Sequence, residues 1–317
     1  MWHKKIDAAT LVHSFFDMFQ EGKNCLRILS LKIGLRINDT IDKSSLESRF
    51  NRRTFAFVVA LLEQVLQTKI ADLEQTNKDN LLNKSILSKF KNILLSDSTC
   101  QTLPSNLSSV FPSTGNQTKK ITATMRVQVI YNYTQKAFSY FDLGHLREND
   151  QSSSDNILGI AKMGDLVLRD LGYFSLEVFK QMISLGIFFI SRFHYSTSVL
   201  DPETEVKIDL LSLLNGKTEL DTEVKLGLKA KLKVRLVAQK LPKAVAEKRI
   251  EKAKKDRNTK ANHTPNYYEL LKWEIFITNV NIDVLSVSQI NHLYQLRWFI
   301  EIIFKTWKSY FNFKNNL

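Results

Sequence analysis

The sequence predicts an α/β protein in which a helical N-terminal segment precedes a mixed sheet flanked by helices. Three patterns indicate this class. Apolar residues recur at helical spacing near the N-terminus, short apolar segments alternate with helical ones from Phe90 onward, and a mostly β region precedes a final helix. With 317 residues, of which 44% are hydrophobic, the chain can bury a large core.

Residues 1–85 are predicted to form a helical domain. Leu11 and Phe15 recur at helical spacing, and a second apolar-periodic segment is expected to end near Gly34. A third helix is expected to begin at Ser44, the first residue of a capping-box pattern, and to carry three arginines. These arginines are Arg49, Arg52 and Arg53. Such a helix suits contact with DNA phosphates or guanine edges, and a solvated basic face is an equally good interpretation.

Residues 86–195 are predicted to form the first part of the core, with elements in the order β-β-β-α-β-α-β. The expected strands are residues 93–96, 121–133, 137–143, 166–168 and 187–191. Asp97 follows the first strand and Asp170 follows the fourth, whereas the rival Asp165 precedes the fourth. This order is that of the ribonuclease H-like fold, in which the first and fourth strands lie side by side. We therefore expect Asp97 and Asp170 to meet at one edge of the sheet.

Residues 196–287 are predicted to form an inserted, mostly β, DNA-contacting domain. Its clearest strand is expected at residues 225–236, where apolar and basic residues alternate. The basic residues assigned to DNA contact are Lys229, Lys231, Lys233 and Arg235. Like charges on one face of a strand repel unless an anion lies across them, which favours DNA over a solvated face.

Residues 288–317 are predicted to complete the core with one helix over residues 289–313. Four residues, Tyr294, Arg297, Glu301 and Lys308, fall on one narrow stripe of that helix, beside a broad apolar stripe. A carboxylate in such a polar seam is costly unless it meets a cation or a metal. The seam therefore predicts a surface for an anionic chain with a metal at its centre.

Three motifs resemble one known family. The spacing Y-x2-R-x3-E-x6-K resembles the YREK signature of bacterial insertion-sequence transposases of the DDE type. The segment SDSTCQTLP around Asp97 resembles the first-aspartate motif of that family, and the segment beginning GDLVLRDLGYF, which contains Asp170, resembles the second. Three such motifs in the right order are hard to obtain by chance. The resemblance covers about residues 90–308 and implies a cut-and-paste DNA transposase with a ribonuclease H-like core.

The resemblance implies metal-dependent excision of an insertion sequence and strand transfer of its 3′-hydroxyl ends into target DNA. Asp97, Asp170 and Glu301 would be the catalytic carboxylates and the ligands of two Mg²⁺ ions, for which Mn²⁺ would substitute. Carboxylate oxygens suit these hard cations, and two such ions can activate the nucleophile and stabilise the leaving oxygen.

The resemblance also implies contacts with the DNA. Tyr294, Arg297 and Lys308 would hold phosphates of the transposon end, and Arg192 would lie near the scissile phosphates. Trp273 would stack a base flipped out near the cleavage site, although a tryptophan packed in the core is a nearly equal interpretation.

Composition indicates the partners and the compartment. Forty-five Lys and Arg against 32 Asp and Glu give a net charge of +13, which favours a polyanion. Two cysteines exclude a disulfide framework and a cysteine-based zinc site. No signal-peptide pattern is present, and the longest strongly apolar run, residues 183–190, is far short of the ~20 residues of a membrane helix. We expect a cytoplasmic protein with no membrane partner. The resemblance implies in addition a nucleoid-associated bacterial protein that binds double-stranded DNA at terminal inverted repeats and target sites, as a homodimer in a synaptic complex.

Two other functions stay open. Members of the resembling family usually continue well beyond the YREK lysine, whereas this sequence stops nine residues after Lys308, so its C-terminus is expected to be truncated. A truncated copy would be an inactive DNA-binding remnant that inhibits full-length transposase. The other alternative is a stand-alone nuclease on the same core.

Overall fold

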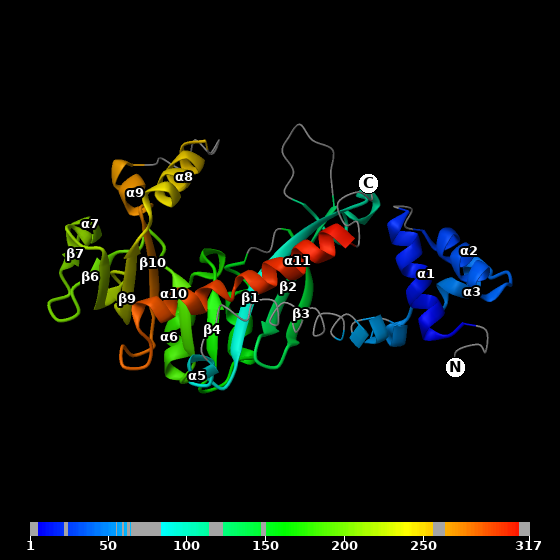
Figure 1. The fold of residues 1–317 in the computed structure, drawn as a ribbon, viewed down its shortest axis with the longest axis horizontal. Coiled ribbons are helices and arrows are strands. Elements are labelled where there is room, and N and C mark those ends of the chain that lie inside the picture. Colours follow the sequence, from blue (N-terminus) through cyan, green and yellow to red (C-terminus); the bar gives the residue numbers. More distant parts are fainter. Residues whose placement is uncertain are drawn as a thin grey trace.

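A ten-stranded mixed sheet organises the protein in this computed structural model (Figure 1). The structure describes residues 6–21, 25–54, 56–58, 60–61, 64, 84–113, 123–146, 150–255 and 264–310. The strands are β1 (Ile93–Leu103), β2 (Ala123–Asn132), β3 (Ala137–His145), β4 (Leu166–Arg169), β5 (Phe188–Arg192), β6 (Val199–Leu200), β7 (Lys207–Ile208), β8 (Glu219–Leu226), β9 (Leu232–Lys240) and β10 (Trp273–Thr278). Their order across the sheet is β3-β2-β1-β4-β5-β10-β9-β8-β6-β7.

Helices cover both faces of the sheet, and three N-terminal helices pack against one another. They are α1 (Ala8–Gln20), α2 (Leu26–Ile37), α3 (Lys43–Glu47), α5 (Lys84–Leu87), α6 (Leu176–Ser184), α7 (Leu210–Leu214), α8 (Lys243–Lys254), α9 (Pro265–Leu270), α10 (Val287–Gln295) and α11 (Trp298–Tyr310). Short 3-10 turns are η1 (Ser105–Leu107), η2 (Ser154–Gly159) and η3 (Leu171–Tyr173). None of the described helices is long and apolar enough to cross a membrane.

The first five strands have the predicted ribonuclease H-like order. β1 lies parallel to β4 and β4 parallel to β5, while β2 and β3 continue the sheet in antiparallel pairs on the other side of β1. Ser96 pairs with Arg169 in the β1–β4 ladder, so the next residues, Asp97 and Asp170, are neighbours. The prediction that these two carboxylates meet despite their separation in sequence is confirmed.

Strand β1 is longer than expected. Asp97 lies inside it, because Ser98 to Leu103 continue to pair with β2, ending with Leu103 opposite Ala123. The predicted end at Ser96 was wrong because the apolar run stops there, whereas pairing with β2 satisfies the backbone hydrogen bonds of the polar residues that follow. Asp97 is therefore held on both sides, by β2 and by the end of β4.

The strands of the predicted insertion extend the core sheet. β10 runs antiparallel to both β5 and β9, and β8, β6 and β7 follow outward. The single strand expected at residues 225–236 was wrong, because the chain turns back between β8 and β9 and pairs Leu226 with Leu232. Gly227 has a φ of 78° and Lys231 a φ of 45°, so backbone in the left-handed region ends one strand and begins the next.

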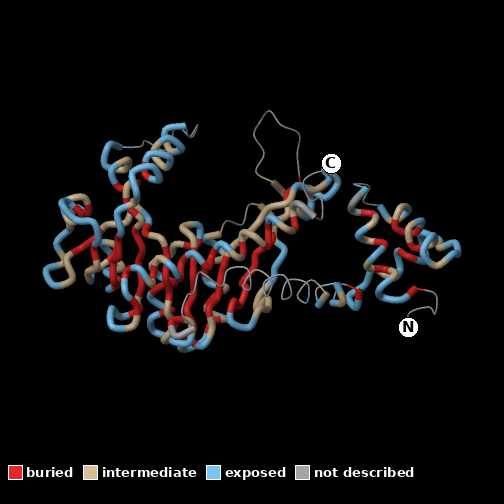
Figure 2. The backbone as a smooth tube through the Cα atoms, viewed as in Figure 1, coloured by how far each residue is buried: buried red, intermediate tan, exposed pale blue. Residues whose placement is uncertain are grey.

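The central strands of the sheet are buried on both faces (Figure 2). Alternate residues of β1 show this: Ile93 and Leu95 join the core under α10 and α11, while Leu94 joins the core under α6. Figure 1 shows α10 and α11 lying across the first of these faces, in front of β4 and β1. Side chains at the positions of Asp97 and Asp170 share that face.

The N-terminal helices form a small core of their own, from Ile6 to Leu46. α2 continues through Gly34 to Ile37, where Asn38 in the left-handed conformation (φ 52°) ends it, so the predicted end at Gly34 was wrong. The cap of α3 is Asp42, which accepts from the backbone N–H of Ser44, and not the predicted Ser44.

The predicted third helix is interrupted. α3 ends at Glu47, and a new helical turn starts at Arg52 after Asn51, whose side chain accepts from the backbone N–H groups of Arg53 and Thr54. Most of the apolar run expected after Arg53 lies outside the described residues.

The final helix is two helices. α10 begins with a capping box formed by Ser286 and Gln289, and Leu296 and Arg297 form a tight turn before α11. The backbone N–H groups of these two residues bond three positions back, to Leu293 and Tyr294, instead of four. The prediction of one continuous helix was wrong on this account, and its part beyond Tyr310 lies outside the described residues.

Candidate active site

Three polar side chains stand at neighbouring strand positions. Asp97 of β1 lies beside Asp170, which directly follows β4, and Arg192 is the last residue of β5, next to β4. Parallel strands bring their carboxyl ends to the same edge, so residues far apart in sequence converge. Helices α10 and α11 close the same face and add Tyr294, Arg297 and Glu301.

Arg297 joins two of the carboxylates. Its Nη1 donates to Asp97 Oδ2 at 3.3 Å, and its Nη2 donates to Glu301 Oε1. The residue is only 7% exposed, because the turn between α10 and α11 points it inward. Burial opposes the charge, but Tyr294 and the carboxylates Asp170, Asp97 and Glu301 outweigh it and raise the pKa of Arg297. The guanidinium therefore stays charged at the centre of the group.

Tyr294 connects the helix to the third carboxylate. Its hydroxyl lies 3.2 Å from the carbonyl oxygen of Arg169 and 3.3 Å from Asp170 Oδ1, and it donates toward both acceptors. Tyr294 is 6% exposed, and the centroid of its ring lies 5.5 Å from Arg192 Cζ. Burial, with the charge of Asp170 adding to it, raises the pKa of Tyr294, so its hydroxyl acts as a neutral donor.

Asp97 is the carboxylate most affected by the surrounding groups. Burial raises its pKa to about 6, the backbone N–H of Ser98 and the charge of Arg297 oppose this, and Asp170 and Glu301 add to it. Any further positive charge that binds at the site would stabilise the charged form of this carboxylate.

The carboxylates do not form a ready-made metal cage. Among the described residues, no three carboxylate, imidazole or thiol groups converge in an arrangement that holds a metal ion. Arg297, bonded to both Asp97 and Glu301, takes the central place. The donor set is nevertheless all oxygen, which suits a hard divalent cation.

Lys308 lies apart from this group. It is half-buried in the last turn of α11, seven residues beyond Glu301, which is about 10 Å along the helix. The structure therefore separates Lys308 from the other three members of the predicted stripe.

Trp273 is a core residue. It starts β10, is 6% exposed and packs in the core on the α6 side of the sheet, with Leu270 and Ile275. A stacking platform needs an open ring face, so the prediction that Trp273 stacks a flipped base was wrong, and the alternative of a packed strand tryptophan holds.

Arg235 is turned inward. Its guanidinium makes a two-pronged ion pair with Asp221, at 2.6 Å for each bond, and donates to the carbonyl oxygens of Val280 and Leu285. At 7% exposure it is not available to DNA, so its predicted role was wrong. Its partner Asp221 lies on β8, before the first residue of the predicted single strand.

The lysines of the hairpin are at the surface. Lys229 is exposed in the turn, Lys231 pairs with Glu205, and Lys233 pairs with Glu223 at 2.9 Å. Neighbouring segments thus supply acids that offset the repulsion on which the DNA assignment rested. In the N-terminal part, Arg49 is half-buried, and Arg52 and Arg53 are exposed.

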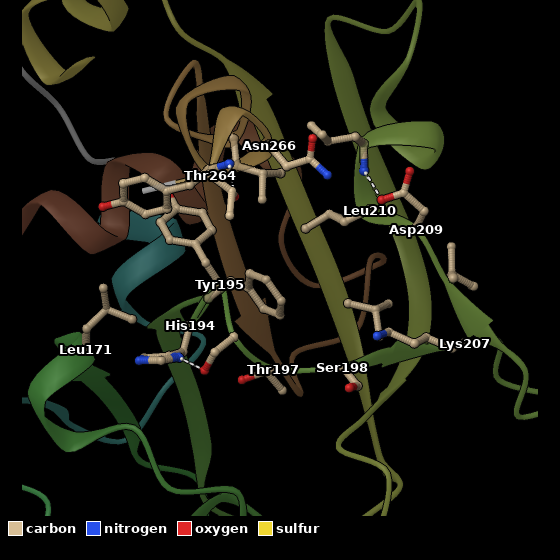
Figure 3. Close-up of a pocket in the computed structure, with 17 residues that line it drawn as sticks. Leu171, His194, Tyr195, Thr197, Ser198, Lys207, Asp209, Leu210, Thr264 and Asn266 are labelled. Carbon is tan, nitrogen blue, oxygen red and sulfur yellow. Dashed lines mark hydrogen bonds between the residues drawn. The ribbon is translucent and has the colours of Figure 1, made fainter. Parts of the chain in front are cut away.

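An open groove of about 1070 Å³ lies beyond the end of β5 and was not predicted (Figure 3). It starts at Leu171, next to Asp170, and continues along the segment after β5. Figure 3 shows His194 and Tyr195 on its wall, and Tyr195 meets Tyr267 of α9 edge to face with centroids 5.4 Å apart. The two tyrosines are 72 residues apart, so no local sequence pattern could have paired them.

Comparison with known proteins identifies the family. Residues 88–317 match the family described as Transposase DDE domain, a segment that includes Asp97, Asp170 and Glu301. The chain belongs to this family. The predicted resemblance to bacterial insertion-sequence DDE transposases is thereby confirmed.

Relatives of the chain are insertion-sequence transposases. It is 31% identical over 292 residues to the transposase for insertion sequence element IS231F of Bacillus thuringiensis subsp. israelensis, covering 86% of this chain and 60% of that protein. It is 29% identical over 322 residues to the transposase for insertion sequence element IS1151 of Clostridium perfringens, covering 93% of this chain and 66% of that protein. The chain thus spans about three fifths of the length of these relatives. Among solved structures, the Mos1 transposase paired-end complex with left transposon end matches over 59% of each chain at 11% identity, with a TM-score of 0.22.

Proposed function

We propose that the chain is the catalytic part of a DNA transposase that excises an insertion sequence and joins its 3′-hydroxyl ends to target DNA. The observation that carries this is the grouping of three carboxylates, with Asp97 inside β1 beside Asp170 at the end of β4, and Glu301 joined to Asp97 through Arg297. Family membership and the transposase names of the relatives support the same reaction.

The carboxylates would hold two divalent cations, Mg²⁺ or in its place Mn²⁺. The donor set fits these cations, because all the ligand atoms are oxygens and a positive charge would stabilise the charged carboxylate of Asp97. When bound, such ions supply an activated nucleophile and neutralise the leaving oxygen of a phosphodiester. In this proposal, Arg297 moves from the carboxylates to a DNA phosphate when the cations enter, which its flexible stem and planar fork allow.

The remaining polar residues would hold the DNA. Tyr294 would orient Asp170 through its hydroxyl. Arg192 lies at the edge of the same site and would be the first cationic side chain to contact a DNA strand that leaves the site. Beyond Arg192, the groove lined by Tyr195 and Tyr267 offers aromatic edges and hydroxyls to the next nucleotides. The partners in this proposal are double-stranded DNA ends and target DNA, with two copies of the chain in the complex that joins them.

Cleavage of DNA that carries the ends of the element tests the proposal. With Mg²⁺, the wild-type chain is expected to nick at the ends, and Glu301→Gln is expected to bind the same DNA without nicking it. Equal nicking by both proteins contradicts the assigned role of Glu301. Binding without nicking by the wild type in both Mg²⁺ and Mn²⁺ contradicts the proposed reaction.

A further inference from the structure

A polar network lies on the face of the sheet opposite the carboxylates. Its centre is Asp150, whose Oδ1 accepts three hydrogen bonds, from Ser98 Oγ at 2.6 Å, Arg126 Nη1 at 2.6 Å and Gln128 Nε2 at 3.3 Å. The residues on β1 and β2 alternate with those facing α10 and α11, so this network sits directly behind the site. None of the residues in this network belongs to the predicted site.

Asp150 touches the chain next to both aspartates. Ser98, one of its donors, directly follows Asp97 in β1. On the other side, Gly172, two residues after Asp170, lies so close that a Cβ added there would be 2.9 Å from Asp150 Oδ2. A single carboxylate is therefore wedged between the segments that carry Asp97 and Asp170.

Further bonds tie the segment around Asp170 to β2 and to Ser154. Tyr173 donates its hydroxyl to Gln128 Oε1 at 2.5 Å, and its backbone carbonyl accepts from Ser154 Oγ at 2.9 Å. Arg169, directly before Asp170, is fully buried and donates to the carbonyl oxygen of Ser154 at 2.6 Å. Linked polar groups of this kind are rigid when their bonds are made, and removal of one member loosens its neighbours.

We propose that Asp150 is a positioning residue that sets the spacing between Asp97 and Asp170 for cation binding. It does not touch the reacting groups. It acts through Ser98 and through the packing of Gly172, in the way that residues behind a metal ligand orient that ligand. This inference rests on the proposed function, because it assumes that the two aspartates share divalent cations.

Direct titration with Mn²⁺ tests it on the full chain without DNA, by calorimetry or by the spectrum of the bound ion. Asp150→Ala is expected to weaken Mn²⁺ binding by about 10- to 100-fold. Asp150→Asn keeps the shape of the side chain and one acceptor oxygen, so its Mn²⁺ affinity should lie between those of Asp150→Ala and the wild type. Ser98→Ala removes only the link to β1 and should weaken binding less than Asp150→Ala. The matched control is Glu205→Ala, which removes a carboxylate with two lysine partners, Lys225 and Lys231, beside the far edge of the sheet.

The outcomes separate the two proposals. Wild-type chain that binds no Mn²⁺ contradicts the proposed metal-dependent function. Wild-type binding with unchanged affinity in Asp150→Ala and Ser98→Ala overturns the positioning role alone. If Asp150→Ala fails to fold, Asp150→Asn and Ser98→Ala decide. A lowered unfolding temperature with full Mn²⁺ affinity in the folded variant also overturns the role, because it shows that the network supports only the fold.

Discussion

The carboxyl of Asp97, whose side chain is only 18% exposed, should make the metal-free protein less stable than it would be with an amide in its place. Its pKa is raised from 3.8 to about 6, chiefly by burial, which corresponds to about 3 kcal/mol of unfolding free energy lost when the group is charged. The folded carboxyl holds its proton more tightly than the unfolded one. The stability that this proton provides is therefore fully present below pH 3.8 and is lost as pH rises to about 6.

Replacing Asp97 with Asn removes this dependence. In EDTA at pH 7.5, Asp97→Asn is expected to be more stable than the wild type to urea, by up to about 3 kcal/mol, and the difference should shrink toward pH 4. Adding Mg²⁺ should stabilise the wild type and leave the variant unchanged.

A second buried aspartate provides the control. Asp165 is 3% exposed and accepts from Asn92 Nδ2 and from the backbone N–H of Lys162, both at 2.8 Å. Asp165→Asn should therefore lose stability at pH 7.5, by about 1–3 kcal/mol. An Asp97→Asn variant that is less stable than the wild type at every pH, in the same way as Asp165→Asn, would refute the reasoning about desolvation.

Three further predictions concern the residues around the site. Arg235→Ala leaves the half-buried Asp221 without its cation and should lower the unfolding free energy by about 1.5–3 kcal/mol, measured with urea, while DNA affinity of the folded protein stays the same; weakened DNA binding at full stability would return Arg235 to the interface. Trp273→Ala should cost about 3–5 kcal/mol of stability because it opens a cavity in the core, and a variant with full stability but without DNA cleavage would argue for base stacking instead. Lys231→Glu combined with Lys233→Glu should weaken DNA binding and flatten its salt dependence, by about 0.9 in slope for each DNA phosphate that the two lysines neutralise; an unchanged slope in filter binding would show that these lysines serve only Glu205 and Glu223.

The core topology was predictable because its signals are local. The apolar segments at Ile93 and Leu166, each followed by an aspartate, fix the two strands, and parallel pairing in the predicted order makes Asp97 and Asp170 neighbours. The three motifs also identified the family, since their order and spacing can be seen without the structure.

Pairing partners far apart in sequence account for the errors. The alternation at residues 225–236 has the period of one strand, but Gly227 takes a positive φ and folds the segment into two. Arg235 looked like part of a basic face because Asp221, its partner, belongs to the other arm of the hairpin. The Asp150 network shows the same limit, because Ser98, Gly172 and Asp150 are brought together only by the folded sheet.

The two-metal assignment is tested most directly by the number of Mn²⁺ ions that the folded chain binds, measured by electron paramagnetic resonance. Two coupled ions per site are expected in the wild type, and the coupled signal should disappear in Asp97→Asn and in Glu301→Gln. An unchanged signal in both variants, or no bound Mn²⁺ in the wild type, would contradict the claim that Asp97, Asp170 and Glu301 form a two-metal site.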